Sequence, residues 1–481
     1  MGVRTREDYI ESLKRQKPVV YMNGDKVDNI IENKFFQVGI NSIAVTYDLA
    51  NDPKFSDAFT LYSSLINEKI SIWTNIQENS DQALIKTKLM RTIGEVTLCP
   101  CHYRCLTTDC VNAAWAVSYE IDKKYGTNYH KNVTEIVKKI QREDLVIGGA
   151  IVDPKGDRRF SPIEQEDPDM YLHIVDKNDE GVIVRGAKSH STAAPYTNLL
   201  CVFPSRPMSK KEKDYAIAFF TPVDADGIKF ICKAPPMPEE SKDIENPISS
   251  RFGHVETTII FDDVFVPWEN VFMCGENEFT VNMLRIFNSF HTWHKCCCRC
   301  ASMELAIGAL ALSTYYAGTT EAPHIKSYLT KMIMNCEIVY ACALAAAIEG
   351  FKHPSGVYVP NRIYGNTGKV FAAEVLGEER YYLQEASGGV VVTMPSEKDY
   401  RNPETGKYLK KYLKARKGTS VDERVKVIKL IEDLIASKWA GWYWGMCISG
   451  GATTQTLKER IFSDFDIEKA KEIAKKAAKI E

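Results

Sequence analysis

The spacing of hydrophobic residues divides the chain into three parts. Residues 5–145 follow mostly helical spacing, with a capped first helix predicted where Asp8 follows Thr5, and with a later helix that ends at Gly126. From about residue 147 to 275 the pattern changes to short β-rich runs separated by Pro, Gly and Asp, which is typical of antiparallel strands. The sequence therefore predicts an α+β fold.

Helical spacing returns after the strands. It predicts four long blocks, at residues 279–317, 325–352, 361–387 and 422–447. Residues 401–420 form a charged and solvated excursion between them, and the tail from residue 466 has the pattern of an amphipathic helix. We predict three domains: an N-terminal helical domain (1–146), a middle antiparallel β domain (147–276) and a C-terminal helical bundle (277–481).

Composition narrows the functional classes. The 481 residues include 61 Lys and Arg and 63 Asp and Glu, so the chain lacks the basic excess of a general nucleic-acid or membrane-surface binder. The N-terminus is charged and has no apolar core of a secretory signal, and no run of 18 apolar residues appears. We expect a cytoplasmic protein with no nucleic-acid or membrane partner.

Fourteen cysteines are many for such a chain, and clustered cysteines in a cytosolic protein are more often metal ligands or catalytic thiols than disulfides. The stretch "HTWHKCCCRC" from His291 to Cys300 follows an upstream "CPCHYRC" from Cys99 to Cys105. Cys201, Cys232 and Cys342 stand alone in apolar runs, where buried thiols act as small hydrophobes.

The spacing within the two stretches suits one shared site. Cys101 and Cys105 are four residues apart, and His291 and Cys298 are seven apart, so each pair lies on one face of a helix. Two facing helices could supply three thiolates and one imidazole, a set that suits tetrahedral zinc or an iron–sulfur cluster. The alternative is a set of unconnected core cysteines.

Six further stretches carry a resemblance to a known family. The segments "YEIDKKYGTNYHKN", "DPKGDR", "VRGAKSH", "DADG", "FDDVFVP" and "GGVVVTMPSE" resemble 4-hydroxybutyryl-CoA dehydratase/vinylacetyl-CoA Δ-isomerase. The resemblance implies an acyl-CoA-dehydrogenase-like fold and a dehydratase or isomerase that acts on a hydroxyacyl-CoA or enoyl-CoA by a radical mechanism.

The resemblance also implies two cofactors. It assigns a [4Fe-4S] cluster to Cys101, Cys105, His291 and Cys298, with His294, Cys296, Cys297 and Cys300 as neighbours rather than ligands. It assigns FAD to a turn within residues 148–159 and to the strand that follows it. The implied FAD-binding residues are Gly149, Val152, Asp153, Lys155, Gly156, Asp157, Lys188 and Thr192. Residues 387–392 are implied to meet a neighbouring subunit in a homotetramer, and an exposed cluster implies oxygen sensitivity.

The implied catalytic residues are His291, as cluster ligand and possible base, and the carboxylate of Glu256. The chain departs from the family pattern where a Tyr is replaced by Lys295, a Lys by Arg299 and a Glu by Gly445. Lys and Gly cannot replace a phenol or a carboxylate in kind. Lys295 can supply positive charge instead, and Tyr103 can return a phenol from the opposite helix, so an altered substrate is expected.

Two other functions stay open on the sequence. One is an FAD-dependent aromatic hydroxylase of the 4-hydroxyphenylacetate 3-monooxygenase type, which shares the fold. That group has a G-R-[ST]-P-D-[YF] stretch where this chain has "GEVTLCPCHYRC". The other is a redox paralogue without catalysis, which the changes at Lys295 and Gly445 would fit.

Overall fold

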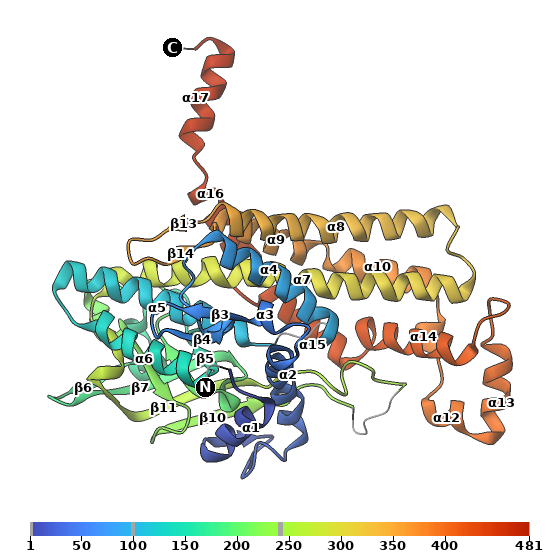
Figure 1. Cartoon of the computed structure of the whole chain (residues 1–481), viewed down its shortest axis with the longest axis horizontal. Coiled ribbons are helices and arrows are strands. Elements are labelled where there is room, and N and C mark those ends of the chain that lie inside the picture. The colour runs from blue at the N-terminus through green and yellow to red at the C-terminus, as the bar shows by residue number, and fades with distance from the viewer. Residues whose placement is uncertain (1–2, 98–101, 239–243, 481) are drawn as a thin grey trace.

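The computed structural model describes residues 3–97, 102–238 and 244–480. Long helices of the C-terminal bundle lie side by side across the upper half of Figure 1, and the sheets lie below them at one end. Of the N-terminal helices, α5 sits between the bundle and the sheets, whereas α1 lies at the lower edge of the molecule. The architecture is α+β, as predicted.

The predicted helices of the N-terminal region are present. They are α1 (Arg6–Arg15), α2 (Lys34–Asn51), α3 (Ser56–Phe59), α4 (Ser80–Thr97), α5 (Arg104–Tyr125) and α6 (Tyr129–Glu143). The capping box of Thr5 and Asp8 starts α1 as predicted. Helix α5 ends at Gly126, whose φ of +69° suits a residue without a side chain.

The N-terminal region, predicted to be mostly helical, also contains short strands. These strands are β1 (Val19–Met22), β2 (Asp25–Lys26), β3 (Thr60–Ser63) and β4 (Glu68–Ser71). Strand β1 pairs in parallel with β10 of the middle region, so the first sheet crosses the boundary at residue 146. The apolar run of β1 has only four residues, and its partner strand lies more than two hundred residues further along the chain. The spacing of hydrophobic residues within so short a run does not show whether it is a strand.

Two sheets make up the middle region, and the larger includes β1 and β2 of the N-terminal region, whereas among the described residues β3 and β4 pair only with each other. The remaining members of the two sheets are β5 (Ile147–Ala150), β6 (His173–Lys177), β7 (Gly181–Thr192), β8 (Leu199–Val202), β9 (Ile217–Pro222), β10 (Ile228–Lys233), β11 (Glu256–Pro267) and β12 (Val271–Cys274). Within the described residues the strand orders are β2-β1-β10-β11-β7-β6 and β12-β9-β8-β5. Most pairs are antiparallel as predicted, but β1 with β10 and β5 with β8 are parallel.

The C-terminal part is a helical bundle. Its elements are α7 (Thr280–Ala317), α8 (Pro323–Ile348), β13 (Phe351–Lys352), β14 (Tyr358–Val359), α9 (Arg362–Glu374), α10 (Leu376–Ser387), α11 (Val390–Thr393), α12 (Glu397–Arg401), α13 (Pro403–Tyr412), α14 (Val421–Ile435), α15 (Lys438–Ser449), α16 (Thr454–Asp464) and α17 (Ile467–Ala478). The predicted blocks 279–317 and 325–352 correspond to α7 and α8.

Two predicted blocks are each divided in two. Block 361–387 breaks at Val375, whose ψ of −6° lies outside the range of a regular helix. Block 422–447 breaks before Ser437, whose side chain caps the first turn of α15. The charged excursion begins at the last residue of α12 and contains α13, which Asn402 caps. Hydrophobic spacing continues across such breaks, so it gave the helical content correctly and the boundaries wrongly.

Two stretches of the bundle, Asn277–Ala317 and Pro323–Ile348, are long and apolar enough to cross a membrane by length and composition alone. The most apolar window of the first is 61% buried inside the protein, which is typical of the core helix of a soluble fold. The expectation that the protein has no membrane partner remains a prediction.

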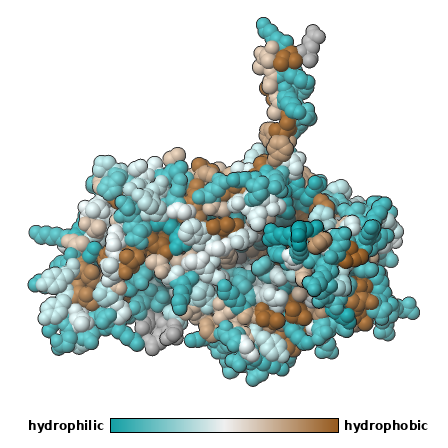
Figure 2. All heavy atoms as spheres, turned by 180° about the vertical axis from the view of Figure 1, so that it is seen from behind, coloured by the Kyte–Doolittle hydropathy of each residue, from teal (hydrophilic) through white to brown (hydrophobic). Residues whose placement is uncertain are grey.

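The C-terminal helix α17 stands away from the body of the molecule, as Figures 1 and 2 show from opposite sides. None of its residues is buried, and Ile473 is 63% exposed. Its amphipathic pattern was predicted. Its apolar residues therefore have no cover from the described part of the chain.

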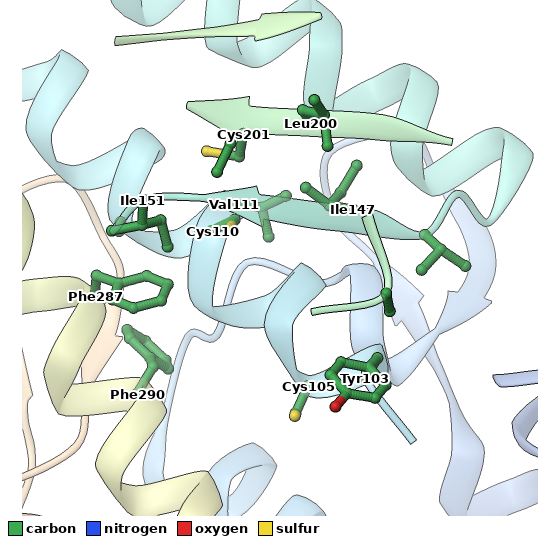
Figure 3. Close-up of a cluster of buried hydrophobic side chains, with 14 of the residues drawn as sticks. Tyr103, Cys105, Cys110, Val111, Ile147, Ile151, Leu200, Cys201, Phe287 and Phe290 are labelled. Atoms are coloured by element: carbon green, nitrogen blue, oxygen red, sulfur yellow. The ribbon is translucent and has the colours of Figure 1, made fainter. Parts of the chain in front are cut away.

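The main hydrophobic core joins all three parts. Figure 3 shows side chains from α5, β5, β8 and α7 meeting in one cluster, among them Cys110, Ile147, Cys201 and Phe287. Cys201 and Cys232 are buried as predicted, but Cys342 is only half-buried. Helix α5 lies between the strands and α7, so it packs against the sheet on one side and against the bundle on the other.

A buried ion pair beneath α5 gives a test of this packing. Arg104, at the start of α5, donates to Asp144, and both side chains are at most 2% exposed. Asp144→Asn keeps a residue that tolerates the positive φ of this position (44°) but leaves the guanidinium without a counter-charge. We expect a loss of about 3–5 kcal/mol in the free energy of unfolding, measured by urea denaturation.

The matched control is Glu468→Gln on α17, because it also removes one partner of an ion pair. That pair, with Lys471, is exposed, so no measurable change in the urea midpoint is expected. Equal midpoints for Asp144→Asn and the wild type would contradict the structural role of the buried pair.

Candidate active site

Helices α5 and α7 lie against each other and run in opposite directions. Near the end of α5, Nζ of Lys124 donates to Glu278 at 2.6 Å. One turn earlier, Glu120 accepts from Asn282. Further back along α5, Asp109 meets residues of the fourth turn of α7. Residues earlier in α5 therefore contact residues later in α7, as expected for two antiparallel helices.

This register decides where the two cysteine motifs meet. Cys105 lies one turn before Asp109 on the same face of α5. It therefore lies opposite the turn of α7 that follows His291 and His294, and that turn carries Cys298. Cys105 is buried and Cys298 is half-buried. Helical spacing therefore assigns Cys105 and Cys298 to facing turns of α5 and α7; Cys101 lies outside the described residues.

Asp109 is the centre of this contact. Nδ1 of His291 lies 2.8 Å from one of its carboxylate oxygens, and Nδ1 of His294 lies 2.6 Å from the other. Asp109 is fully buried, and burial alone would raise its pKa. The two imidazoles outweigh burial and bring the pKa of Asp109 below its ordinary value, whereas burial lowers the pKa of His294.

The other edge of His291 faces the loop that follows α15. A Cβ atom built on Gly451 would lie 3.3 Å from Cδ2 and 3.9 Å from Nε2 of His291. A Cβ atom on Gly450 would lie 3.3 Å from Nζ of Lys295. The two glycines therefore let this loop close over His291 and Lys295, and larger residues there would crowd both side chains.

Positive charge gathers at the same place. Lys369 donates to the carbonyl groups of Cys447 and Ile448 at 2.9 and 3.1 Å, which caps the end of α15. Burial, followed by the charge of Lys295, lowers the pKa of Lys369 to about 8. Two ammonium groups this close favour an anion nearby.

The neighbouring cysteines lie against other helices: Cys296 and Cys300 face the bundle, and Cys297 lies beside Thr87 of α4. Sγ of Cys296 lies 3.3 Å from the carbonyl oxygen of Gly365, and Cys300 contacts the backbone of Cys336 on α8. Burial raises the pKa of Cys297 to about 12. Cys298 lies about 200° around the helix from Cys296. These buried thiols are protonated and structural, as expected for neighbours rather than ligands.

A second polar group adjoins the start of α5. Nε2 of His254 lies 3.1 Å from one oxygen of Glu256, and the hydroxyl group of Thr192 donates to the other at 2.8 Å. Tyr103 packs edge-on against His254 at 4.9 Å, and Trp442 of α15 lies 4.4 Å from the same ring. The structure thus joins the predicted residues Tyr103, Glu256 and Thr192 through His254.

His254 and Asp109 were not among the residues singled out from the sequence. A signal for His254 was present, because His-x-Glu in an extended segment puts both side chains on one side. Asp109 also had a signal, because it follows Cys105 by four residues and so lies on the same helix face. A carboxylate buried on that face needs a polar partner. Neither signal identifies that partner without the fold.

The start of the predicted flavin-binding turn packs on a buried ion pair. Lys188 is buried and contacts Asp153 as well as the carbonyl group of Phe203 at 2.9 Å. Asp153 also accepts from the backbone and the hydroxyl group of Ser205. Burial lowers the pKa of Lys188, although Asp153 opposes this effect. Asp153 and Lys188 therefore hold the turn in place through each other.

The tip of this turn is more open. Gly156 has φ +54°, and a Cβ atom there would lie 2.4 Å from the side chain of Gln165. Lys155 is exposed, and Asp157 pairs with Arg159. At the base, a Cβ atom on Gly149 would lie 3.1 Å from Leu106 of α5. The carbonyl group of Val152 accepts from Ser189 at 2.7 Å.

Two of the departures from the family pattern have clear surroundings. Arg299 forms a buried ion pair with Glu379 and also donates to Ser302, so it acts within the bundle. Gly445 is exposed on α15, and a Cβ atom there would meet nothing within 4 Å. Further along the same segment, Gly450 and Gly451 lie beside Lys295 and His291.

A complete metal centre cannot be assembled from the described residues. Across residues 3–97, 102–238 and 244–480, no group of three or more His, Cys, Asp and Glu side chains is arranged to hold a metal ion. Cys105, His291 and Cys298 carry the donor types that an iron–sulfur cluster takes, and they come from the two packed helices α5 and α7.

Comparison with known proteins gives the family. The N-terminal and C-terminal models of 4-hydroxyphenylacetate 3-hydroxylase match residues 5–273 and 281–479. The chain is 36% identical to the 4-hydroxybutyryl-CoA dehydratase/vinylacetyl-CoA Δ-isomerase of Clostridium aminobutyricum, over 99% of both chains.

Solved structures agree. An oxygen-tolerant archaeal 4-hydroxybutyryl-CoA dehydratase from N. maritimus matches with a TM-score of 0.94 and 35% identity, covering 100% of this chain and 95% of that one. The oxygenase component of 4-hydroxyphenylacetate 3-monooxygenase, complexed with FAD, matches with a TM-score of 0.87 and 23% identity over 98% of each chain, which shows the shared fold.

The paired cysteine motifs, the fold and the identity along the whole chain agree with the resemblance seen in the sequence. The chain belongs to the 4-hydroxyphenylacetate 3-hydroxylase family and, within it, is an enzyme of the 4-hydroxybutyryl-CoA dehydratase/vinylacetyl-CoA Δ-isomerase type.

Proposed function

We propose that this enzyme is a flavin- and [4Fe-4S]-dependent dehydratase/isomerase that acts on a hydroxyacyl-CoA or enoyl-CoA. The observation that carries the proposal is the contact of Asp109 on α5 with His291 and His294 on α7. With that register, helical spacing leads us to expect Cys105 opposite the turn that carries Cys298. The identity of 36% to a dehydratase over 99% of the chain supports the same reaction class.

The proposed cluster ligands are Cys101, Cys105, His291 and Cys298. For FAD, the proposed contacts are the open turn around Gly156 and the side chain of Thr192, while Asp153 and Lys188 would shape the turn from beneath. When bound, the flavin would supply one-electron transfer that acidifies the Cβ hydrogen of the substrate, and the cluster a Lewis acid for the departing hydroxyl group.

The protein's own groups would handle protons and charge. Both carboxylate oxygens of Glu256 are held, one by His254 and one by Thr192, so Glu256 is oriented as a proton acceptor. Nε2 of His291 would be a second acceptor. The ammonium group of Lys295 would stabilise a substrate enolate, which the thioester makes accessible at Cα. The loop at Gly450 would limit the entry of water.

We also propose an acyl-CoA-dehydrogenase-like domain layout and a homotetramer in the cytoplasm. Ile333, Met334 and Ile338 on α8 are between 42% and 53% exposed, which is unusual for large apolar side chains on one helix. Apolar patches also interrupt the hydrophilic surface in Figure 2. Gly388 and Gly389 have open space beside them and Val392 is 66% exposed, which suits a segment that a neighbouring subunit covers.

A second candidate is the aromatic hydroxylase, favoured by the family models that match the chain. Anaerobically purified enzyme should be tested with 4-hydroxybutyryl-CoA, related hydroxyacyl-CoA and enoyl-CoA thioesters, and with 4-hydroxyphenylacetate plus reduced FAD and oxygen. We expect loss of water or a shifted double bond from a CoA thioester. Hydroxylation of the phenol with no reaction of any thioester would favour the hydroxylase; no turnover of either would favour a redox paralogue.

The first prediction for the site concerns iron. Anaerobically purified protein should hold about four iron per chain. Cys101→Ala, Cys105→Ala and Cys298→Ala should each lower the iron content, because each removes a proposed thiolate ligand. Iron and acid-labile sulfide analysis measures this directly.

The matched controls are Cys297→Ala and Cys300→Ala, because they remove buried thiols from neighbouring positions of α7 that pack against α4 and α8. Both should keep the wild-type iron content. One zinc per chain without iron would contradict the cluster. Oxygen sensitivity remains a prediction, and the solved relative from N. maritimus is described as oxygen tolerant.

The second prediction concerns Lys295. Lys295→Ala should lower kcat by a factor of about 100, because a positioned charge in a site with little water stabilises charge that develops in the transition state. Steady-state kinetics on the best thioester of the panel measures this. Lys458→Ala, which removes an exposed lysine from an ion pair with Glu374, is the control and should leave kcat unchanged.

The third prediction tests the departures in reverse. Lys295→Tyr combined with Gly445→Glu should raise activity on 4-hydroxybutyryl-CoA, because it returns a phenol and a carboxylate to the family positions. Space at Gly445 allows the larger residue. Efficient turnover of 4-hydroxybutyryl-CoA by the wild type, with no effect of Lys295→Ala, would show that the substrate has not changed.

A further inference from the structure

The carboxylate of Asp109 lies between two imidazoles, and this arrangement constrains where their protons are. Nδ1 of His291 and Nδ1 of His294 lie 2.8 and 2.6 Å from its two oxygens. An ionised carboxylate has only acceptors. Both Nδ1 atoms must therefore carry hydrogen and donate, and a neutral His291 then has its lone pair on Nε2.

Each oxygen of this carboxylate is held by a hydrogen bond to one imidazole. Besides the two imidazoles, the fully buried Lys86 of α4 interacts electrostatically with Asp109. Its ammonium group lies 2.6 Å from the side-chain oxygen of Asn75. Burial lowers the pKa of Lys86 to about 7, and Asp109 opposes that loss of charge. The charge of Asp109 therefore has cationic or hydrogen-bonding partners on each side.

The two imidazoles have different surroundings. His294 is fully buried and stacked on Trp293 at 4.3 Å, and its Nε2 atom has no hydrogen-bond partner within the described part of the chain. His291 is partly exposed, and its Nε2 edge faces Gly451 beside Lys295. His294 therefore braces one oxygen of Asp109, while the other oxygen directs His291 toward the site.

We propose that Asp109 is a positioning residue: its carboxylate fixes His291 as the Nδ1–H tautomer and so makes Nε2 the atom presented to a metal ion or to substrate. The identity of what Nε2 meets rests on the proposed function. The tautomer does not, because it follows from the protein's own hydrogen bonds. A carboxylate behind a ligating imidazole also raises the basicity of the ligand and fixes its ring.

The test uses Asp109→Asn. An amide has one acceptor and one donor group, so it cannot accept from both Nδ1–H groups. The matched control is Glu120→Gln, which changes a carboxylate on the same helix that contacts His353 at 2.9 Å and also meets α7. Circular dichroism of both variants checks that the helices are intact.

The first readout is iron retention by the anaerobic protein in a chelator titration. Asp109→Asn should weaken iron binding by about 10- to 100-fold, the usual cost of losing the partner of a metal-bound histidine, whereas Glu120→Gln should match the wild type. Equal retention by Asp109→Asn and the wild type would overturn the inference.

The second readout needs no metal. Nitrogen NMR of iron-free, ¹⁵N-histidine-labelled protein, with His291→Gln to assign the signal, reports which ring nitrogen carries hydrogen. We expect a hydrogen-free Nε2 for His291 in the wild type and a changed pattern in Asp109→Asn. A protonated Nε2 in the wild type contradicts the inference, whether or not the protein binds iron. Wild-type protein without iron but with the expected tautomer would contradict only the proposed cluster.

Discussion

The antiparallel contact between α5 and α7 is the constraint on which the site depends. Asp109 and His291 are 182 residues apart in the sequence, yet the register of the two helices brings them within hydrogen-bond distance. The same register sets Cys105 opposite the turn with Cys298. A buried carboxylate is tolerated only with strong partners, so the pair of imidazoles that stabilises Asp109 also fixes the position of one helix along the other.

The rest of the site is arranged around this contact. The sheet contributes Glu256, which His254 and Thr192 hold by its two oxygens. Helix α15 contributes Trp442 against His254, and the loop after it covers His291. The groups proposed to handle substrate thus come from three separate regions of the chain, while the buried thiols of Cys296, Cys297 and Cys300 on α7 contribute to packing. Burial and orientation, rather than residue type, separate cysteines suited to bind metal from those that are not.

Sequence reasoning reached the elements whose signals are local. The cap at Thr5, the end of α5 at Gly126 and the long helix α7 are all set by residues near each other in the chain. It failed where partners are distant: β1 was missed because its neighbour β10 lies far along the chain, and parallel pairing of β5 with β8 leaves no local mark. For the site, the spacing of His291 and Cys298 identified one helix face, and Asp109 and His254 emerged only when the fold supplied their partners. The assignment of a cluster and of FAD came from family resemblance, because spacing alone left zinc and iron both open.

The central claim is that α5 and α7 together hold an iron–sulfur cluster. The most direct measurement is an anomalous difference map at the iron absorption edge, from crystals grown without oxygen. The account predicts iron density between the start of α5 and α7, in bonding contact with the sulfur atoms of Cys105 and Cys298 and with Nε2 of His291. Density at the zinc edge alone, iron bound through His294, or no metal between the two helices would contradict it.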